Sequence, residues 1–213
     1  MDSQNEQKNL DVLLSRLREE GRIPTLFLHA CCAPCSSYVL EYLSKYFRIT
    51  VFFYNPNIYP SEENRIRADE LSRLICALPA ENPITLMEGK YDPDVFYACT
   101  KGMETLPEGG ERCFACYRLR LAEAAKIAKE KGFDYFASTL SLSPYKNAKM
   151  LNAIGRELAE EYGVSWLPND FKKRNGHKRS IELSKEYDLY RQDYCGCVYS
   201  YLARRGSESG ESV

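Results

Sequence analysis

The chain has 213 residues, of which 44% are hydrophobic and 28% charged, and its formal net charge is −1. This balance is typical of a globular protein and excludes a general attraction to nucleic acids or anionic membranes, so any such contact needs a local basic patch. No apolar run is long enough to cross a membrane, and the polar start MDSQNEQKNL is unlike a secretory signal. We therefore expect a cytoplasmic protein that makes no contact with membranes.

The hydrophobic pattern predicts helices and strands that alternate along the chain. An amphipathic helix over residues 3–20 comes first. The expected strands span 25–30, 48–55, 84–89, 133–139 and 164–168, and the expected later helices span 36–45, 61–78, 93–99, 113–131 and 146–162, with Ser61 as an N-cap and Gly132 as a C-terminal stop. Such alternation predicts an α/β fold, a Rossmann-like parallel sheet with helices on both faces. We expect a single domain over residues 1–205 and a disordered tail over 206–213, which is rich in Gly, Ser and Glu.

The cysteines are the most informative feature of the sequence, because seven of the nine lie in three short segments. These segments are HACCAPCSS with Cys31, Cys32 and Cys35, ERCFACY with Cys113 and Cys116, and DYCGCVY with Cys195 and Cys197. In a reducing compartment such groups are more often metal ligands or redox thiols than disulfides. The first group also follows a strand and precedes a helix N-terminus, where the helix dipole favours thiolates.

The number and spacing of the grouped thiols favour an iron–sulfur centre over zinc. Cys35 and Cys113 are much further apart than the roughly 15–20 residues usual between the knuckles of a zinc ribbon, and one zinc ion takes only about four ligands. We expect one iron–sulfur cluster, with the remaining thiols holding a second metal or forming a redox-active pair. Cys76 and Cys99 are expected to have packing roles, and His29 to be a hydrogen-bonding neighbour of the site rather than a ligand.

A basic run, FKKRNGHKR over residues 171–179, stands out in a chain with no overall positive charge. Two interpretations are open: a solvated loop, or a phosphate-binding surface for RNA that Arg65 and Arg67 could extend. The candidate substrate-binding residues are Lys172, Lys173, Arg174, Lys178 and Arg179. The hydroxyl-rich segment STLSLSPYK, residues 138–146, either lines a polar pocket or caps the next helix.

Five motifs together resemble those of the QueH-type epoxyqueuosine reductases. They are HACCAPCSS, FFYNPNIYP with the downstream ENRIRADE, ERCFACYRLRL, FASTLSLSPYKN and RQDYCGCVYS, and the resemblance covers residues 25–201. It implies an adenine-nucleotide hydrolase-like (HUP) architecture and an oxidoreductase that removes the epoxide oxygen of epoxyqueuosine in tRNA with two electrons, the last step of queuosine biosynthesis. The implied partners are epoxyqueuosine-containing tRNA and an electron donor of unknown identity.

The resemblance also implies a metal centre. Its 4Fe-4S cluster would be held by Cys31, Cys32, Cys113 and Cys116. Cys195 and Cys197 would form a redox pair or, with Cys35 and Asp193, bind a second, mononuclear iron. Asp193 or Tyr194 would supply a proton. How the cysteines divide between the two centres stays open at this point.

Two other functions remain as alternatives. An ATP-dependent tRNA thiolation enzyme can share the fold and carry clusters, but it needs a Ser/Gly-rich phosphate loop after the first strand, where this chain has HACCAPCSS. The other alternative is a zinc-stabilised RNA-binding module without catalysis. Such a module would be colourless, whereas an iron–sulfur protein is brown and absorbs near roughly 400 nm.

Overall fold

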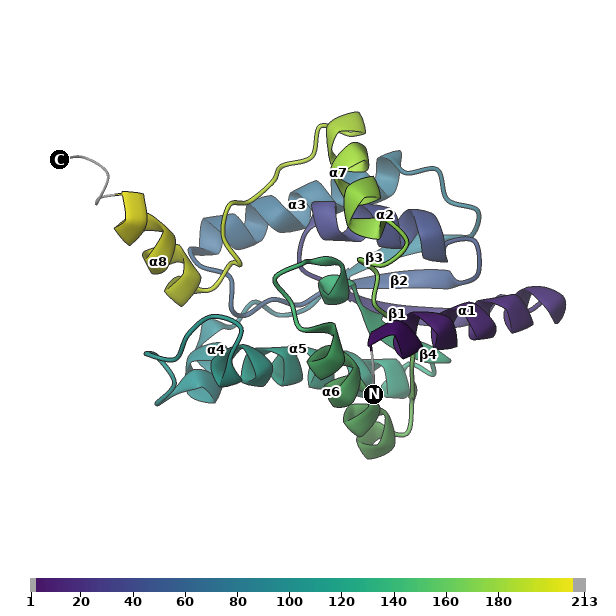
Figure 1. The fold of residues 1–213 in the computed structure, drawn as a ribbon, viewed down its shortest axis with the longest axis horizontal. Helices are drawn as coiled ribbons and strands as arrows, with labels where there is room; N and C mark the ends of the chain where they lie inside the picture. Colours follow the sequence, from purple (N-terminus) through teal and green to yellow (C-terminus); the bar gives the residue numbers. More distant parts are fainter. Residues whose placement is uncertain (1–2, 209–213) are drawn as a thin grey trace.

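A parallel sheet of five strands forms the centre of the molecule (Figure 1). The computed structural model describes residues 3–208. The strands are β1 (Thr25–Ala30), β2 (Arg48–Phe53), β3 (Ile84–Glu88), β4 (Tyr135–Ser138) and β5 (Ser165–Trp166), in the order β3-β2-β1-β4-β5. The strand order therefore reverses between β1 and β4, and ligands of open α/β sheets bind outside the carboxyl ends of the strands at such a switch point.

Helices cover the sheet on both faces. They are α1 (Ser3–Glu19), α2 (Ala33–Leu43), α3 (Ser61–Ala77), α4 (Pro93–Thr100), α5 (Glu111–Glu130), α6 (Ala148–Tyr162), α7 (Gly176–Glu186) and α8 (Val198–Glu208), with a short 3-10 helix, η1 (Thr139–Leu142), after β4. In Figure 1, α2 and α3 lie on one side of the sheet and α5 and α6 on the other. The predicted α/β fold with helices on both faces is confirmed.

The central strand β1 is apolar along its whole length because it is covered from both sides. Successive side chains of a strand point to opposite faces. Leu26 and Leu28 accordingly join the apolar cluster under α2 and α3, whereas Phe27 joins the cluster that contains Tyr117 of α5. A continuous apolar run is what a parallel strand buried on both faces requires.

Four predicted helix starts were off by one to three residues, among them α5, which begins at Glu111 rather than 113, and α6, which begins at Ala148 rather than 146. Helix α2 begins at Ala33 rather than residue 36, because Pro34 is suited to the first helical turn, so Cys35 lies inside the helix. The N-cap of α3 is Pro60, and Ser61 is the first helical residue. Gly132 follows the end of α5 with φ +71°, the left-handed conformation expected of a C-terminal stop.

Helices α7 and α8 were not predicted. Helix α7 begins inside the basic run, and its sequence GHKRSIELSKE has only two large apolar residues, Ile181 and Leu183, so no run of apolar residues at helical spacing marks it. Gly176 allows α7 to pack closely: an added Cβ would lie 1.9 Å from the carbonyl oxygen of Phe171 and 2.5 Å from the ring of Tyr38. Residues 206–208 of the predicted tail belong to α8, and residues 209–213 lie outside the described residues.

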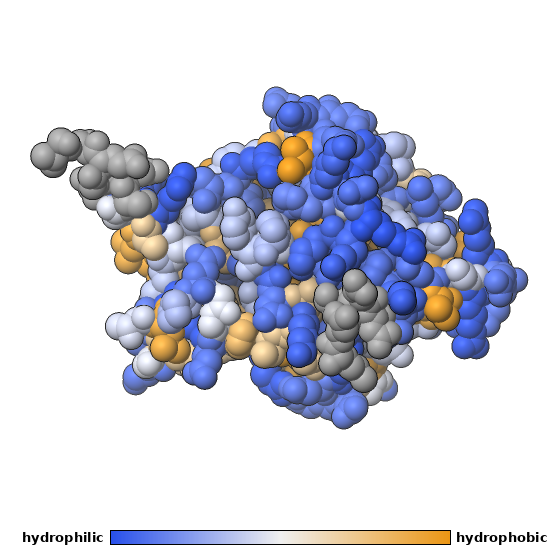
Figure 2. All heavy atoms as spheres, viewed as in Figure 1, coloured by the Kyte–Doolittle hydropathy of each residue, from blue (hydrophilic) through white to orange (hydrophobic). Residues whose placement is uncertain are grey.

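The predicted packing role of Cys76 is wrong. Cys76 is exposed rather than packed in the core, because α3 buries Leu71 and Leu74 and position 76 lies about 200° further around the helix than Leu74. The face shown in Figure 2 is mostly hydrophilic, with small separated apolar patches. Among the helices of residues 3–208, none has the length and apolar composition needed to cross a membrane.

Candidate functional site

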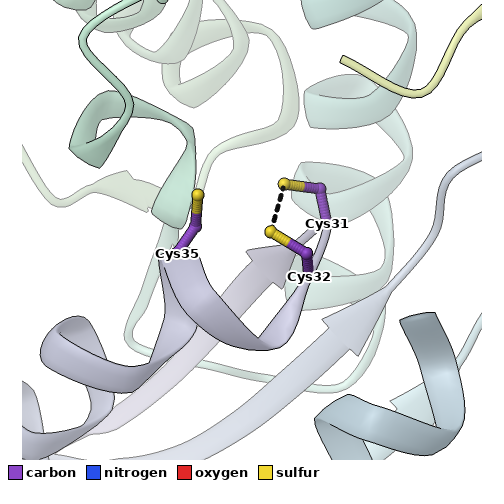
Figure 3. A group of neighbouring side chains, drawn as sticks. All are labelled: Cys31, Cys32 and Cys35. Atoms are coloured by element: carbon purple, nitrogen blue, oxygen red, sulfur yellow. Dashed lines mark hydrogen bonds between the residues drawn. The ribbon is translucent and has the colours of Figure 1, made fainter. Parts of the chain in front are cut away.

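The first cysteine group lies at the carboxyl end of β1, where the chain turns into α2. Cys32 has an extended backbone and is the N-cap of α2, and Cys35 follows in the first turn. The sulfurs of Cys31, Cys32 and Cys35 all lie within 4.8 Å of one another, and those of Cys31 and Cys32 are 3.7 Å apart (Figure 3). Strand end, Pro-initiated turn and helix thus bring three thiols to one point.

The pKa values of these three thiols are shifted in different directions. The thiols of Cys31 and Cys35 donate to the sulfur of Cys32, which lowers the pKa of Cys32 well below its ordinary value, and the nearby Arg67 lowers it further. The hydrogen bond with Cys32 raises the pKa of Cys31 to about 12, and hydrogen bonds with Cys31 and then Cys32 raise the pKa of Cys35. Three cysteine sulfurs within 4.8 Å of one another are a donor set typical of a metal site.

The second group occupies the first turns of α5. Cys113 and Cys116 are three residues apart, so their side chains lie on the same side of the helix, and both are about nine-tenths buried. The backbone N–H of Gly109 donates to the sulfur of Cys113 at 3.2 Å. Burial raises the pKa of Cys116 to about 12. Cys116 packs with Phe96 and Cys197, and Cys99, which was expected to have a packing role, lies against the same cluster.

The third group is held in place by an unusual backbone. Gly196 has φ +122°, and an added Cβ would lie 3.0 Å from Nη1 of Arg67, so this position needs glycine. Arg67 donates to the carbonyl of Cys195 at 3.3 Å, and the N–H of Tyr59 donates to the carbonyl of Gly196 at 2.7 Å. The turn directs the two thiols differently: Cys197 is buried beside Cys116, and Cys195 lines a cavity.

A lysine contacts the third group directly. The ammonium nitrogen of Lys146 donates to the sulfur of Cys195 at 2.6 Å, and its side chain is 9% exposed. Burial lowers the pKa of Lys146, but the charges of Cys195 and Tyr117 and the hydrogen bond with Cys195 outweigh burial and raise it. Lys146 belongs to the STLSLSPYK segment, which therefore lines the pocket rather than only capping a helix.

The cavity joins the first and third cysteine groups. Its volume is about 650 Å³, and it opens beside the β1–α2 turn, η1, the start of α7 and the segment before α8. Its lining includes Cys31, Cys35, Cys195, Lys146, His177 and Asp193. Asp193 is exposed and forms a 3.6 Å ion pair with Arg204. Tyr194 also lines the cavity, but its hydroxyl donates to the carbonyl of Tyr59.

The five candidate basic residues do not form one free patch. Arg174 pairs with Asp11, Lys172 with Asp170, and Arg179 with Glu41 at 2.6 Å. Lys173 and Lys178 are exposed. Within the described part of the chain, no ion pair engages these two lysines. Only these two are free to meet phosphate without first breaking an ion pair.

Sequence reasoning missed or misplaced two cations of the site. Arg67, expected as part of a surface patch, is 1% exposed and pairs with Glu63 at 2.6 Å. Arg120 is 2% exposed and was not singled out. Its spacing from Cys113, Cys116 and Tyr117 places it on the buried face of α5, and a charged residue on an apolar helix face is the signal that would have found it. His29 is not among the grouped ligand candidates: it is buried between Ser138 and the carbonyl of Tyr54, as expected.

Comparison with known proteins decides the family. The family model described as epoxyqueuosine reductase QueH matches residues 26–203. The chain belongs to this family. It is therefore an oxidoreductase, and the cysteine groups, Lys146 and all the residues that line the cavity except Arg204 lie within the matched residues.

Relatives of the same description span most of the chain. The epoxyqueuosine reductase QueH of Streptococcus pyogenes is 42% identical over 202 residues, covering 92% of this chain and 79% of the relative. That of Staphylococcus epidermidis is also 42% identical and covers 93% and 85%. That of Thermotoga maritima is 34% identical over 187 residues and covers 85% and 92%.

Two solved structures are similar at low sequence identity. One is described as a predicted subunit of tRNA methyltransferase from Methanocaldococcus jannaschii, with a TM-score of 0.48 and 12% identity, covering 87% of this chain and 89% of that one. The other is an NMN synthetase from Francisella tularensis, with a TM-score of 0.41 and 10% identity, covering 100% and 98%.

Proposed function

We propose that this chain reduces epoxyqueuosine in tRNA to queuosine at the cavity beside the cysteine groups, using a 4Fe-4S cluster and a second metal or redox cysteine pair. The observation that carries the proposal is that the first and third cysteine segments line one cavity and the second packs against both of them, in a member of the epoxyqueuosine reductase family. A tRNA substrate agrees with a cytoplasmic location, which we also propose.

The side chains present fit an iron–sulfur cluster. We assign its ligands to Cys31, Cys32, Cys113 and Cys116. Cys31 packs against the apolar cluster that contains Cys113, and the charge of Arg120 acts on both Cys31 and Cys116. Buried thiols beside buried guanidinium groups are suited to a centre that is anionic overall. A bound cluster would supply electrons one at a time.

The remaining thiols form the second element. Cys35, Cys195 and Asp193 line the same cavity, which supports a second iron bound there. Cys195 and Cys197 flank Gly196 in the turn, and Cys197 lies beside Cys116. This position equally supports a Cys195–Cys197 redox pair that receives electrons from the cluster. Both versions use the same turn, whose geometry depends on Gly196 and Arg67.

The reaction sets what the cavity must provide. Removing the epoxide oxygen breaks two C–O bonds, forms a C=C bond and releases the oxygen as water, so two electrons and two protons enter. Negative charge develops on the departing oxygen, and a fixed positive charge aimed at it stabilises the transition state. Lys146 has its ammonium group at the cavity wall, 2.6 Å from the sulfur of Cys195, and we assign it this role. Asp193 remains our candidate proton donor.

The rim of the cavity suits a nucleotide. A volume of about 650 Å³ is within the range of small-molecule sites, large enough for one modified nucleoside. Tyr145 lines it with a ring that is 83% exposed, and exposed aromatic rings are stacking platforms for unpaired bases. We propose that Tyr145 stacks on a base of the tRNA while Lys173 and Lys178 contact phosphates.

The decisive experiment is iron and sulfide analysis of anaerobically purified protein, combined with an assay on epoxyqueuosine-containing tRNA and a reductant such as dithionite. The wild type should be brown, contain sulfide and at least as much iron, and form queuosine. Cys113→Ser and Cys116→Ser should lose the visible absorption and all turnover, because each removes a cluster ligand. Cys76→Ser, a change of an exposed cysteine on α3, is the matched control and should behave as the wild type.

Two outcomes would contradict the proposal. Colourless protein that contains only zinc and binds tRNA without changing it would favour an RNA-binding module. Full colour and activity in Cys113→Ser and Cys116→Ser would exclude these residues as ligands. Retained colour with loss of turnover in Cys195→Ser would separate the second element from the cluster.

A further inference from the structure

Arg120 of α5 is a buried cation without a carboxylate partner. Its side chain is 2% exposed. It donates from Nε to the carbonyl of Cys116 at 3.2 Å and from Nη1 to the side-chain oxygen of Asn55 at 3.3 Å. None of the ion pairs among residues 3–208 includes it, in contrast to Arg67, which pairs with Glu63. Both hydrogen-bond acceptors of Arg120 are neutral.

A guanidinium group is always charged in a protein, and a buried charge needs an opposite charge nearby. Burial lowers the pKa of Arg120, but Cys116, Cys31 and Cys195 raise it, and Tyr117 adds to their effect. These cysteines come from the first, second and third groups. Arg120 is therefore a buried cation on which residues of all three cysteine segments act.

Arg120 also connects two of these segments mechanically. The side-chain amide of Asn55, which accepts from Arg120, donates to the carbonyl of Ala30 at 2.9 Å. Ala30 is the last residue of β1 and immediately precedes Cys31. The bonds Arg120–Asn55–Ala30 thus join α5, which carries Cys113 and Cys116, to the strand end that carries Cys31 and Cys32.

We propose that Arg120 is a positioning residue that supplies the shared positive charge for the three cysteine segments and, through Asn55, holds α5 against the end of β1. The proposal rests on the proposed cluster, because its main consequence concerns the electrons that the cluster accepts. Reduction adds negative charge, and a neighbouring positive charge stabilises the more negative state.

The first test is the reduction potential of the cluster in the loaded enzyme. Arg120→Gln removes the charge and keeps a hydrogen-bonding side chain, Arg120→Lys keeps the charge, and Arg118→Gln changes an exposed arginine of the same helix that pairs with Glu157 and Glu161. An electron paramagnetic resonance titration against mediators of known potential gives each value.

Arg120→Gln should disfavour reduction about tenfold, which for a one-electron couple is a shift of about 59 mV to more negative potential. Arg120→Lys and Arg118→Gln should stay within about twofold of the wild type. A potential in Arg120→Gln equal to that of the wild type would overturn the proposal.

A second measurement decides the question if the Arg120→Gln variant does not take up the cluster. Cobalt(II) binding to the metal-free full-length chain, followed by its thiolate absorption, should be about tenfold weaker in Arg120→Gln than in Arg120→Lys. Equal affinity would show that the charge is not required. Loss of cobalt binding in a folded Arg120→Lys variant would show that the charge alone is not sufficient, and would overturn the assignment to charge. Iron and sulfide missing from the wild type would refute the proposed cluster instead, and the cobalt comparison would still decide the role of Arg120.

Discussion

The arginines beside the cysteines and the arginines of the basic run carry the same charge in opposite settings. Arg67 and Arg120 are almost fully buried. Among residues 3–208, Arg67 forms an ion pair with Glu63, and Arg120 forms none. Arg174 and Arg179 are near the surface, and acidic side chains neutralise both. The comparison teaches that the positive charge available to an anion at the thiols lies inside the molecule, whereas only Lys173 and Lys178 of the basic run are without an ion pair in the described structure.

Removing Glu63 should have the largest effect on stability. The ion pair Arg67–Glu63 is buried, and Glu63 also accepts from the hydroxyl of Tyr190 at 2.8 Å. Glu63→Ala leaves the buried guanidinium without its carboxylate and should lower the free energy of unfolding by about 3 kcal/mol. Urea denaturation of the metal-free protein measures it. The control Glu41→Ala breaks the partly exposed pair with Arg179 and should cost about 0.5 kcal/mol; similar losses in both variants would contradict the contrast between buried and surface pairs.

Lys146 tests whether the buried cations act in the reaction. Lys146→Met removes the charge beside Cys195 while keeping a long apolar side chain, and kcat should fall about 100-fold with little change in tRNA affinity, the size expected for losing one stabilising group in a transition state. Single-turnover kinetics and filter binding separate the two quantities. Lys149→Met, a change on the exposed side of α6, should keep wild-type kcat. A pure loss of tRNA affinity in Lys146→Met would assign Lys146 to binding instead.

Tyr145 tests the rim of the cavity. Loss of a stacking ring costs roughly 1–3 kcal/mol per base, so Tyr145→Ala should raise KM about tenfold with kcat nearly unchanged. Tyr145→Phe keeps the ring and should restore the wild-type KM. If Tyr145→Phe is as poor as Tyr145→Ala, the hydroxyl rather than the ring makes the contact.

The smallest expected effect is within the basic run itself. Lys178→Ala should weaken tRNA binding a few-fold and reduce the slope of log affinity against log salt by about 1, because Lys178 has no acidic partner in the described structure. Arg179→Ala should leave that slope unchanged, since Glu41 already neutralises Arg179. A larger effect from Arg179 than from Lys178 would mean that tRNA displaces the carboxylate.

Much of the fold was predictable because it depends on local patterns. The apolar run TLFLHA identified β1, and the periodicity of Leu121, Ala124 and Ala128 identified α5. Helix α7 could not be predicted in this way, because its stability comes from packing against α2 through Gly176 rather than from an apolar stripe. The same limit explains Cys76, which periodicity alone placed on the wrong side of α3.

The sequence by itself determined the three cysteine groups, the strand-to-helix turn that carries the first group, and the resemblance to the epoxyqueuosine reductases. Spacing over a few residues is enough for these features, because neighbouring residues are held together by the chain itself. The tertiary structure alone decided which thiols face the cavity and which cations accompany them. Lys146 meets Cys195 across 49 residues and Arg120 meets Asn55 across 65. Contacts of that range depend on how the helices pack on the sheet, and no local pattern records them.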